Sequence, residues 1–420
     1  STLLKEERRD IHRKIWENSI DKESMFSIYH AFKGELFDEV IEFGEKLIEK
    51  LNERGSISDL KLLTDFLIES YKAKNLKISK NCLYKRIYSL LHLGFLEEAK
   101  DLIENLGEED INYYYFLSLY FSFKGKKEKS LYILKKGIDL LKEKGKELFI
   151  SLADILLDMG KFKEAFSVLE KIKDEVNLWE KSKRLKFMNL YQTALENTGD
   201  YEKSLEICFE LYKEKENLSL SELAKLESSI AYNNLMIGKL DESEDFFKKS
   251  IEKYNFLREY RSLYPVLTEY SFLLYTKGEL EDSFKNLKRA KYLAESMKAV
   301  EYLAKIYAYE GIFYLSMGKI KKAEESFLRA KDFFKIEKLQ KVINITVIHN
   351  YAVFLLYKRK FEDSIYYFKK LVELSREEND KYRENLNLYS LSLTYFLSGD
   401  IDSSLKYIEA VSYTHLTLPT

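Results

Sequence analysis

The sequence predicts an all-α protein: a right-handed superhelical solenoid of about ten helical hairpins, with a repeat period of about 40 residues. Its 420 residues contain only 15 glycines and 2 prolines, so the turns that sheets need are scarce and little interrupts a helix. Hydrophobic residues make up 45% of the chain, which is enough for a large core. A phrase centred on glycine recurs at nearly regular spacing, and that recurrence predicts a repeat architecture.

Charge and cysteine content exclude several function classes. Lysine and arginine number 69 against 70 aspartates and glutamates, a net charge of −1, which argues against nucleic-acid binding and a polybasic membrane anchor. No apolar stretch reaches the roughly 18 residues of a membrane span. Cys82 and Cys208 are far apart in the sequence and neither has a CxxC partner. We therefore expect no disulfide framework, a reducing compartment such as the cytoplasm, and neither nucleic acid nor membrane as a partner.

Each repeat phrase joins an apolar helix end to a turn residue, followed five positions later by a small residue. MGKFKEA at Met159–Ala165 and MGKIKKA at Met317–Ala323 are clear examples. The turn residues are Gly94, Gly125, Gly160, Gly199, Gly238, Gly278, Gly318, Arg359 and Gly399. Gly34, in FKGELFDE, is a weaker match, and we expect the gap between Gly34 and Gly94 to hold a degenerate unit at 62–82.

Each hairpin follows one physical logic. The first helix ends where glycine supplies a positive φ, and the second helix returns antiparallel. Side chains must be small where the two helices pack closely. Seven residues before the turn stand Ser118, Ala153, Gln192, Ala231, Ser271, Gly311, Ala352 and Ser392, of which only Gln192 is large. Five residues after it stand Ser130, Ala165, Ser204, Ser243, Ser283, Ala323, Ser364 and Ser404.

These columns resemble the tetratricopeptide repeat (TPR) over roughly residues 20–410. One unit carries the family's spacing at Tyr307, Gly311, Tyr314, Gly318, Ala323, Phe327 and Ala330. The family repeats about every 34 residues, whereas the later units here are longer and lack its helix-ending proline. Longer helices and proline-free junctions are similar to the TPR-like arms of bacterial signalling ATPases.

The first residues resemble a junction found in the STAND class of signal-transduction ATPases. RRDIHRKI, at residues 8–15, is followed by Tyr29 and His30 and then by Gly34 and Glu35. In that class a similar pattern joins the last helix of a winged-helix domain to the arm. A plain amphipathic capping helix is the alternative, and both remain open. The resemblance implies that a nucleotide-binding domain precedes this segment, which has no GxxxxGK[ST] motif and is not expected to bind ATP.

We therefore expect three regions: a junction or capping helix at 1–19, a repeat array at 20–410 and a tail at 411–420. The tail, VSYTHLTLPT, breaks the helical period and looks like translated adapter DNA, so we expect it to be non-native.

No catalytic or metal-ligating pattern is present in the sequence. The five histidines are His12, His30, His92, His349 and His415, at no metal-ligand spacing. No GxSxG motif occurs, and the carboxylates lie beside lysines at the spacing of solvated helix faces. We expect no metal, no cofactor and no enzymatic activity, and expect His12 and His30 at an interface between the first helices.

In the TPR pattern, the inner face of each first helix lies 13, 10, 6 and 3 residues before the turn. These positions give Lys186, Asn189, Thr193, Glu196, Lys225, Ser228, Tyr232, Leu235, Pro265, Thr268, Phe272, Tyr275, Lys305, Ala308, Ile312, Leu315, Thr346, His349, Val353 and Leu356. From them we predict a partner-binding groove formed by Lys186, Asn189, Lys225, Tyr232, Thr268, Phe272, Tyr275, Lys305 and His349. The alternative is that this face packs against its own neighbouring repeats.

The sequence favours a non-catalytic interaction and regulatory arm of a larger bacterial signal-transduction protein. Such an arm would bind a peptide or partner protein in its groove, with the ATPase and output domains outside this segment. A stand-alone TPR adaptor is the second hypothesis, and an enzyme segment is the weakest.

Overall fold

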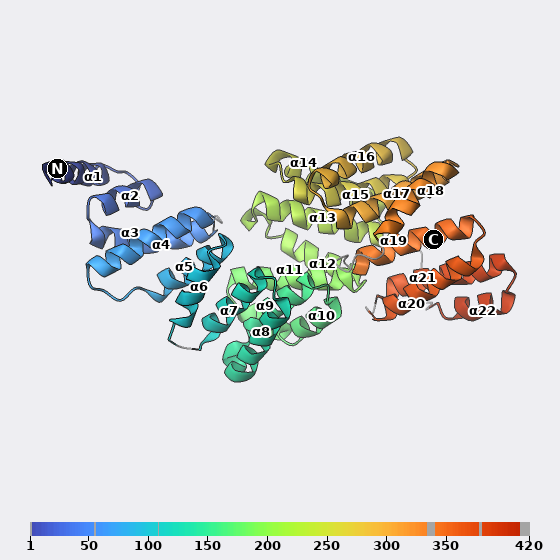
Figure 1. Ribbon diagram of the computed structural model, residues 1–420, viewed down its shortest axis with the longest axis horizontal. Coiled ribbons are helices and arrows are strands. Elements are labelled where there is room, and N and C mark those ends of the chain that lie inside the picture. The colour runs from blue at the N-terminus through green and yellow to red at the C-terminus, as the bar shows by residue number, and fades with distance from the viewer. Residues whose placement is uncertain (1, 54–55, 108, 334–340, 378–379, 412–420) are drawn as a thin grey trace. The chain divides into compact units, whose positions relative to one another are not determined.

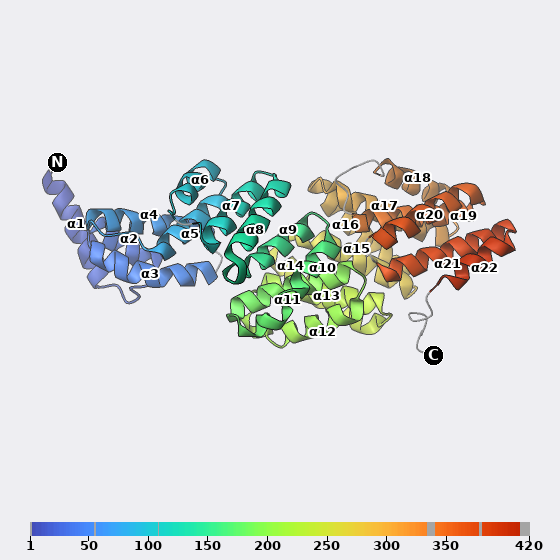
Figure 2. The ribbon, with the colours of Figure 1, turned by 90° about the horizontal axis from the view of Figure 1, so that it is seen from below.

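The structure is a computed structural model that describes residues 2–53, 56–107, 109–333, 341–377 and 380–411 (Figures 1 and 2). These residues form 22 α-helices and three short 3-10 helices, and no strand occurs among them. The chain divides into two compact units, Ser1–Ile155 and Leu156–Thr420, a division that falls inside α9. It does not test the region boundaries predicted near residues 19 and 410, which stay predictions.

Successive helices pair into hairpins along each unit. The two helices of a hairpin lie side by side, as α15 and α16 do in both views (Figures 1 and 2). The N-terminal unit contains α1 (Thr2–Glu17), α2 (Met25–Lys33), α3 (Phe37–Glu53), α4 (Ile57–Ala73), α5 (Lys80–His92), α6 (Leu96–Glu104), α7 (Ile111–Phe123), α8 (Lys127–Leu141) and most of α9 (Leu148–Asp158). The C-terminal unit contains α10 (Phe162–Glu170), α11 (Lys181–Asn197), α12 (Tyr201–Tyr212), α13 (Leu220–Met236), α14 (Leu240–Leu257), α15 (Tyr260–Thr276), α16 (Leu280–Ser296), α17 (Val300–Ser316), α18 (Ile320–Asp332), α19 (Lys341–Tyr357), α20 (Phe361–Glu377), α21 (Lys381–Ser398) and α22 (Ile401–Glu409).

The turn residues adopt the conformation that the sequence predicts. All eight glycines of the repeat turns have φ between 69° and 93°, and Arg359 takes their place with φ 55°. At one such turn, Gly278 N–H donates to Tyr275 C=O at 3.0 Å and Glu279 N–H donates to Leu274 C=O at 2.8 Å. These bonds satisfy carbonyls that the helix end leaves without partners, so the turn closes the first helix and starts the second.

The column of small residues has a second role that the sequence did not reveal. Where the residue five positions after the turn is serine, its hydroxyl bonds to the facing helix: Ser243 Oγ donates to Ala231 C=O at 2.7 Å, and Ser364 Oγ donates to Ala352 C=O at 3.0 Å. Small size therefore permits the close approach, and the hydroxyl then binds the two helices together.

The first turn differs from the prediction. Gly34 has φ −80°, and Glu35, one position later, carries the positive φ of 56°. Gly34 instead allows a close approach, because a Cβ there would lie 3.0 Å from Arg13 Cγ. Within the gap where a degenerate unit was expected, α4 ends at a left-handed turn, with Asn75 at φ 53°.

The two motifs of the junction-like start contact each other. His12 Nδ1 lies 2.7 Å from His30 Nδ1, and Arg13 Nε donates to Gly34 C=O at 2.8 Å. Burial, together with the neighbouring His12, lowers the pKa of His30. The histidines thus lie at the α1–α2 interface, as the sequence led us to expect.

The core of the C-terminal unit lies between neighbouring hairpins. One cluster joins aromatic and aliphatic side chains of α13 to α17, including Phe247, Leu274, Leu287 and Phe313. Val411, the first residue of the predicted tail, is 3% exposed and belongs to a cluster with Val372 and Leu388. The other nine residues of that tail lie outside the described residues.

Candidate functional site

The C-terminal unit contains a cavity of about 220 Å³ that is open to solvent on one side. Four successive first helices, α11, α13, α15 and α17, supply most of its wall, and α21 closes one side. Its lining consists of Glu196, Asn197, Ser228, Ser229, Tyr232, Phe247, Pro265, Val266, Glu269, Tyr302, Lys305 and Arg383. Five of these residues, Glu196, Ser228, Tyr232, Pro265 and Lys305, are predicted inner-face positions. The cavity is therefore built in part from the face that the repeat pattern turns inward, and it carries charged side chains of both signs.

The first charged group in the cavity is an ion pair between neighbouring repeats. Lys305 Nζ, on α17, donates to the carboxylate of Glu269, on α15, and Tyr309 Oη donates to the same carboxylate at 3.3 Å. The two charged side chains are only 9% and 14% exposed. Removal of either partner would leave a poorly solvated charge, which is costly.

The second charged group joins segments that are far apart in the sequence. Arg383, on α21, pairs with Asp380, and both are nearly buried. The same guanidinium donates to Tyr232 Oη, on α13, at 3.4 Å. The ring of Tyr382 meets that of Tyr201 edge-on, with centroids 5.6 Å apart. Within this unit, the start of α21 thus contacts α12 and α13.

Glu196 is the remaining charged group of the cavity. Its carboxylate accepts a hydrogen bond from Gln192 Nε2 at 2.7 Å and another from Ser229. Burial raises the pKa of Glu196 from 4.5 to about 7; the attraction of Lys225 opposes that rise, and the repulsion of Glu269 adds to it. The Lys225 side chain is exposed. Among the ion pairs of the described residues, none neutralises Glu196.

The structure brings only two of the predicted groove residues, Tyr232 and Lys305, into the cavity. Lys186 and Lys225 are exposed on α11 and α13, and Asn189 is half-buried, with its amide bonded to a carbonyl of α11. Whether any of these residues binds a partner stays a prediction.

The remaining predicted residues make contacts within the fold. Thr268 is buried and donates to Tyr264 C=O at 2.8 Å. The rings of Phe272 and Tyr275 stack on those of Tyr309 and Phe313, with centroids 4.9 and 4.5 Å apart. Phe272 and Tyr275 thus make the contacts between neighbouring repeats that the alternative expects, whereas the hydrogen bond of Thr268 lies within α15. Whether the three residues also bind a partner stays a prediction.

His349 also makes a contact between neighbouring first helices. Its Nδ1 lies 2.7 Å from Asn387 Oδ1, and burial lowers its pKa. The contact fixes the imidazole between α19 and α21.

Sequence reasoning missed two of the cavity's charges. Glu269 lies one residue beyond Thr268, outside the inner-face register, and no repeat position marks Arg383. Glu196 was among the inner-face positions but not among the chosen groove residues. The large Gln192 in a column of small residues could have indicated Glu196, because the Gln192 amide donates a hydrogen bond to that carboxylate.

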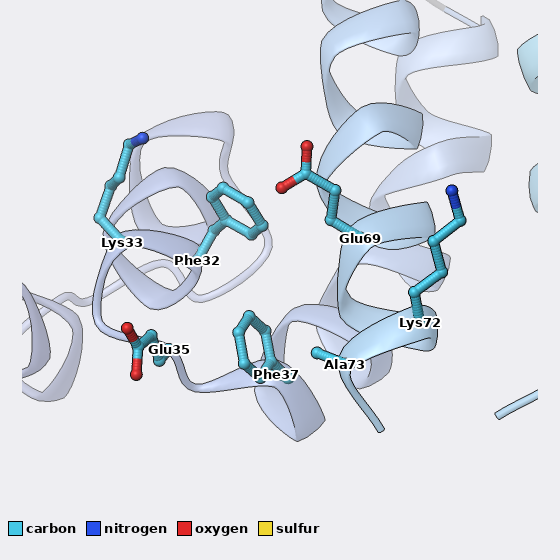
Figure 3. Close-up of a pocket in the computed structure, with 7 residues that line it drawn as sticks. All are labelled: Phe32, Lys33, Glu35, Phe37, Glu69, Lys72 and Ala73. Atoms are coloured by element: carbon cyan, nitrogen blue, oxygen red, sulfur yellow. The ribbon is translucent and has the colours of Figure 1, made fainter. Parts of the chain in front are cut away.

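The N-terminal unit has a hollow of a different kind, of about 460 Å³ (Figure 3). Phe32 and Phe37 lie on one side of it and Glu69 and Lys72, from α4, on the other, with the Glu69 carboxylate directed toward Phe32. The ring of Phe32 stacks on Phe66 at 4.5 Å. The charged side chains of this hollow are exposed.

The described part of the chain contains no metal-ligand cluster and no activated cysteine. No group of three or more histidine, cysteine, aspartate or glutamate side chains there could hold a metal ion. Cys82 and Cys208 are buried, and burial raises the pKa of Cys82 to about 12 and that of Cys208 further, so neither is an activated thiolate. Within the same residues, no helix is long and apolar enough to cross a membrane.

No protein-family model matches this chain, and no curated protein matches it. Its fold is similar to that of a Rap protein crystallised with the competence and sporulation factor, with TM-score 0.57 and 14% identity over 81% of this chain and 99% of that one. Aspartyl phosphate phosphatase F from Bacillus subtilis aligns with TM-score 0.49 and 14% identity, over 80% of this chain and 94% of that one. The similarity to the Rap protein establishes the fold: the chain is a TPR-like helical repeat solenoid.

Proposed function

We propose that this chain is a non-catalytic interaction and regulatory arm whose C-terminal unit binds a peptide or a segment of a partner protein. The observation that carries the proposal is the cavity lined mainly by α11, α13, α15 and α17, because it presents charged and aromatic side chains from four successive repeats. A rigid concave surface with a few fixed polar groups suits an extended ligand.

The Rap similarity supports this proposal at the level of the fold, since that protein was crystallised with the competence and sporulation factor. It transfers no binding residues at 14% identity.

The wider context we propose is a bacterial signal-transduction ATPase of the STAND class, located in the cytoplasm. The support is the junction-like start, where Arg13 and His12 of the first motif contact Gly34 and His30 of the second. A stand-alone adaptor is the alternative. Sequencing the gene outward at its native locus distinguishes them: an upstream Walker motif and winged helix support the arm, and a start codon just upstream supports the adaptor.

Photo-crosslinking in the native host tests the binding surface. A benzophenone amino acid at Ser228, which lines the cavity, should give a discrete covalent adduct with a partner. The same amino acid at Tyr292, 70% exposed on the second helix α16, is the matched control and should give none. Adducts from Tyr292 alone, or from neither position, would contradict a binding surface on the first helices.

A further inference from the structure

Among the four charged side chains that line the cavity, only Glu196 has no oppositely charged group in contact. Lys305 is paired with Glu269, and Arg383 is paired with Asp380. Both cations therefore already have carboxylate partners. Glu196 has only neutral donors in contact, the Gln192 amide and the Ser229 hydroxyl. A half-buried carboxylate without a cation in contact is an unfavourable arrangement that a ligand cation would relieve.

The size of the cavity restricts what can enter it. A volume of about 220 Å³ would hold roughly seven waters, at about 30 Å³ for each. That is less than the roughly 300–1,000 Å³ of sites that enclose a whole small molecule. The cavity is thus suited to one long side chain, with the backbone of the ligand remaining outside.

We propose that this cavity receives one arginine side chain of a bound peptide, with its guanidinium on the Glu196 carboxylate. The inference rests on the proposed peptide-binding function and specifies its ligand chemistry. Arginine fits better than lysine because its planar guanidinium binds a carboxylate through two parallel hydrogen bonds and is more weakly hydrated than an ammonium.

The surroundings of Glu196 suit this role. Gln192 and Ser229 hold the carboxylate by hydrogen bonds, and neither is a cation. The aromatic side chains of Tyr232 and Tyr302 also line the cavity, where they can pack on the methylene stem and the cation. An acidic ligand side chain is disfavoured because it would have to displace Glu269 or Asp380 from its cation and then face Glu196.

Binding of a cation requires the ionised form of Glu196. Because its pKa is raised to about 7, affinity should increase about tenfold between pH 6 and pH 8. The titratable and charged groups that interact with it are Lys225, Glu269, Tyr201, Tyr232 and Cys208. Burial raises the pKa values of the two tyrosines and the cysteine, so these groups stay neutral across that range.

The test uses the full chain and fluorescent, N-acetylated, C-amidated hexapeptide sub-libraries, each with one fixed residue: arginine, its neutral isostere citrulline, or glutamate. Fluorescence anisotropy should show the arginine set binding at least tenfold more tightly than the citrulline set. Glu196→Gln should reduce that preference below twofold and remove the pH dependence. Glu206→Gln, an exposed carboxylate on α12, is the matched control and should change neither.

Two results would overturn the proposal in different ways. Binding of the sub-libraries without an arginine preference, or with a glutamate preference, rejects the Glu196 subsite and leaves peptide binding intact. No binding of any sub-library to the unmodified chain rejects short-peptide binding itself, and the subsite with it. Circular dichroism melting of Glu196→Gln shows that the variant is folded in either case.

Discussion

The cavity of the C-terminal unit and the hollow beside α2 and α4 contain similar residue types in different surroundings. Both combine aromatic rings with lysine and glutamate. In the hollow, Lys72 and Glu69 are exposed, and the main packing contact is the stacking of the Phe32 ring on the Phe66 ring. In the cavity, Lys305 is nearly buried and forms an ion pair with Glu269. Charged residues therefore mark a candidate site only where they are buried, because a buried charge without a partner costs free energy and an exposed one costs little.

The largest expected difference between the two regions concerns their lysines. Lys305→Met should reduce the local free energy of unfolding around α15 and α17 by about 3 kcal/mol, because Glu269 would keep a buried charge without its cation. Lys72→Met, in the exposed hollow, should change stability by less than about 0.5 kcal/mol. Hydrogen exchange of the individual helices measures both effects, and equal losses would contradict the comparison.

The aromatic contact of the hollow should matter more than its charges. Phe32→Ala removes the stacking on Phe66, and because Phe32 is only half-buried the expected loss is about 2 kcal/mol, at the low end for phenylalanine truncation. Exchange protection of α2 and α4 reports this loss. Protection unchanged from that of the unmodified chain would mean that the ring contributes little to the fold.

The pH dependence of stability should reveal the raised pKa of the half-buried Glu196. The folded state binds a proton at Glu196 more tightly than the unfolded state, because its pKa is raised to about 7. The stabilisation that this proton gives the folded state is therefore fully present below about pH 4.5 and is lost as pH rises through about 7. Relative to the unmodified chain, Glu196→Gln should gain about 1–2 kcal/mol of stability between pH 5 and pH 8, after allowing for partial solvent access.

Glu69→Gln, on the open hollow, is the matched control for that measurement and should show no such gain. A gain of the same size in both variants would mean that Glu196 is not distinguished by its surroundings.

The smallest effect is expected at the rim of the hollow. Glu35→Gly relaxes a residue held at φ 56° but removes an exposed ion pair with Arg9, whose atoms lie 3.1 Å apart. These contributions oppose each other, so exchange from α2 should change by less than about 0.5 kcal/mol. A loss above about 1 kcal/mol would show that the Arg9 pair stabilises the α1–α2 junction more than an exposed pair should.

The sequence predicted the local geometry of the repeats well, because that geometry depends on residues close together in the chain. The positive φ at Gly278 and the close packing at Ser243 follow from residue type and spacing alone. The first turn was misplaced by one residue, because Gly34 serves the packing of Arg13 rather than the turn.

The site could be predicted only in part. The inner-face register included Glu196, Tyr232 and Lys305, all of which line the cavity. The contact of Arg383 with Tyr232, 151 positions away, depends on small rotations that accumulate over several repeats, and no local pattern encodes their sum.

Hydrogen exchange with and without the arginine-containing hexapeptides tests the central claim most directly, because it reports on the cavity and the hollow of the same chain at once. The account predicts new protection in α11, α13, α15 and α17, lost in Glu196→Gln and retained in Glu206→Gln. Protection confined to α2, α3 and α4 would place binding at the aromatic hollow instead. That result would contradict a binding site on the first helices of the C-terminal unit.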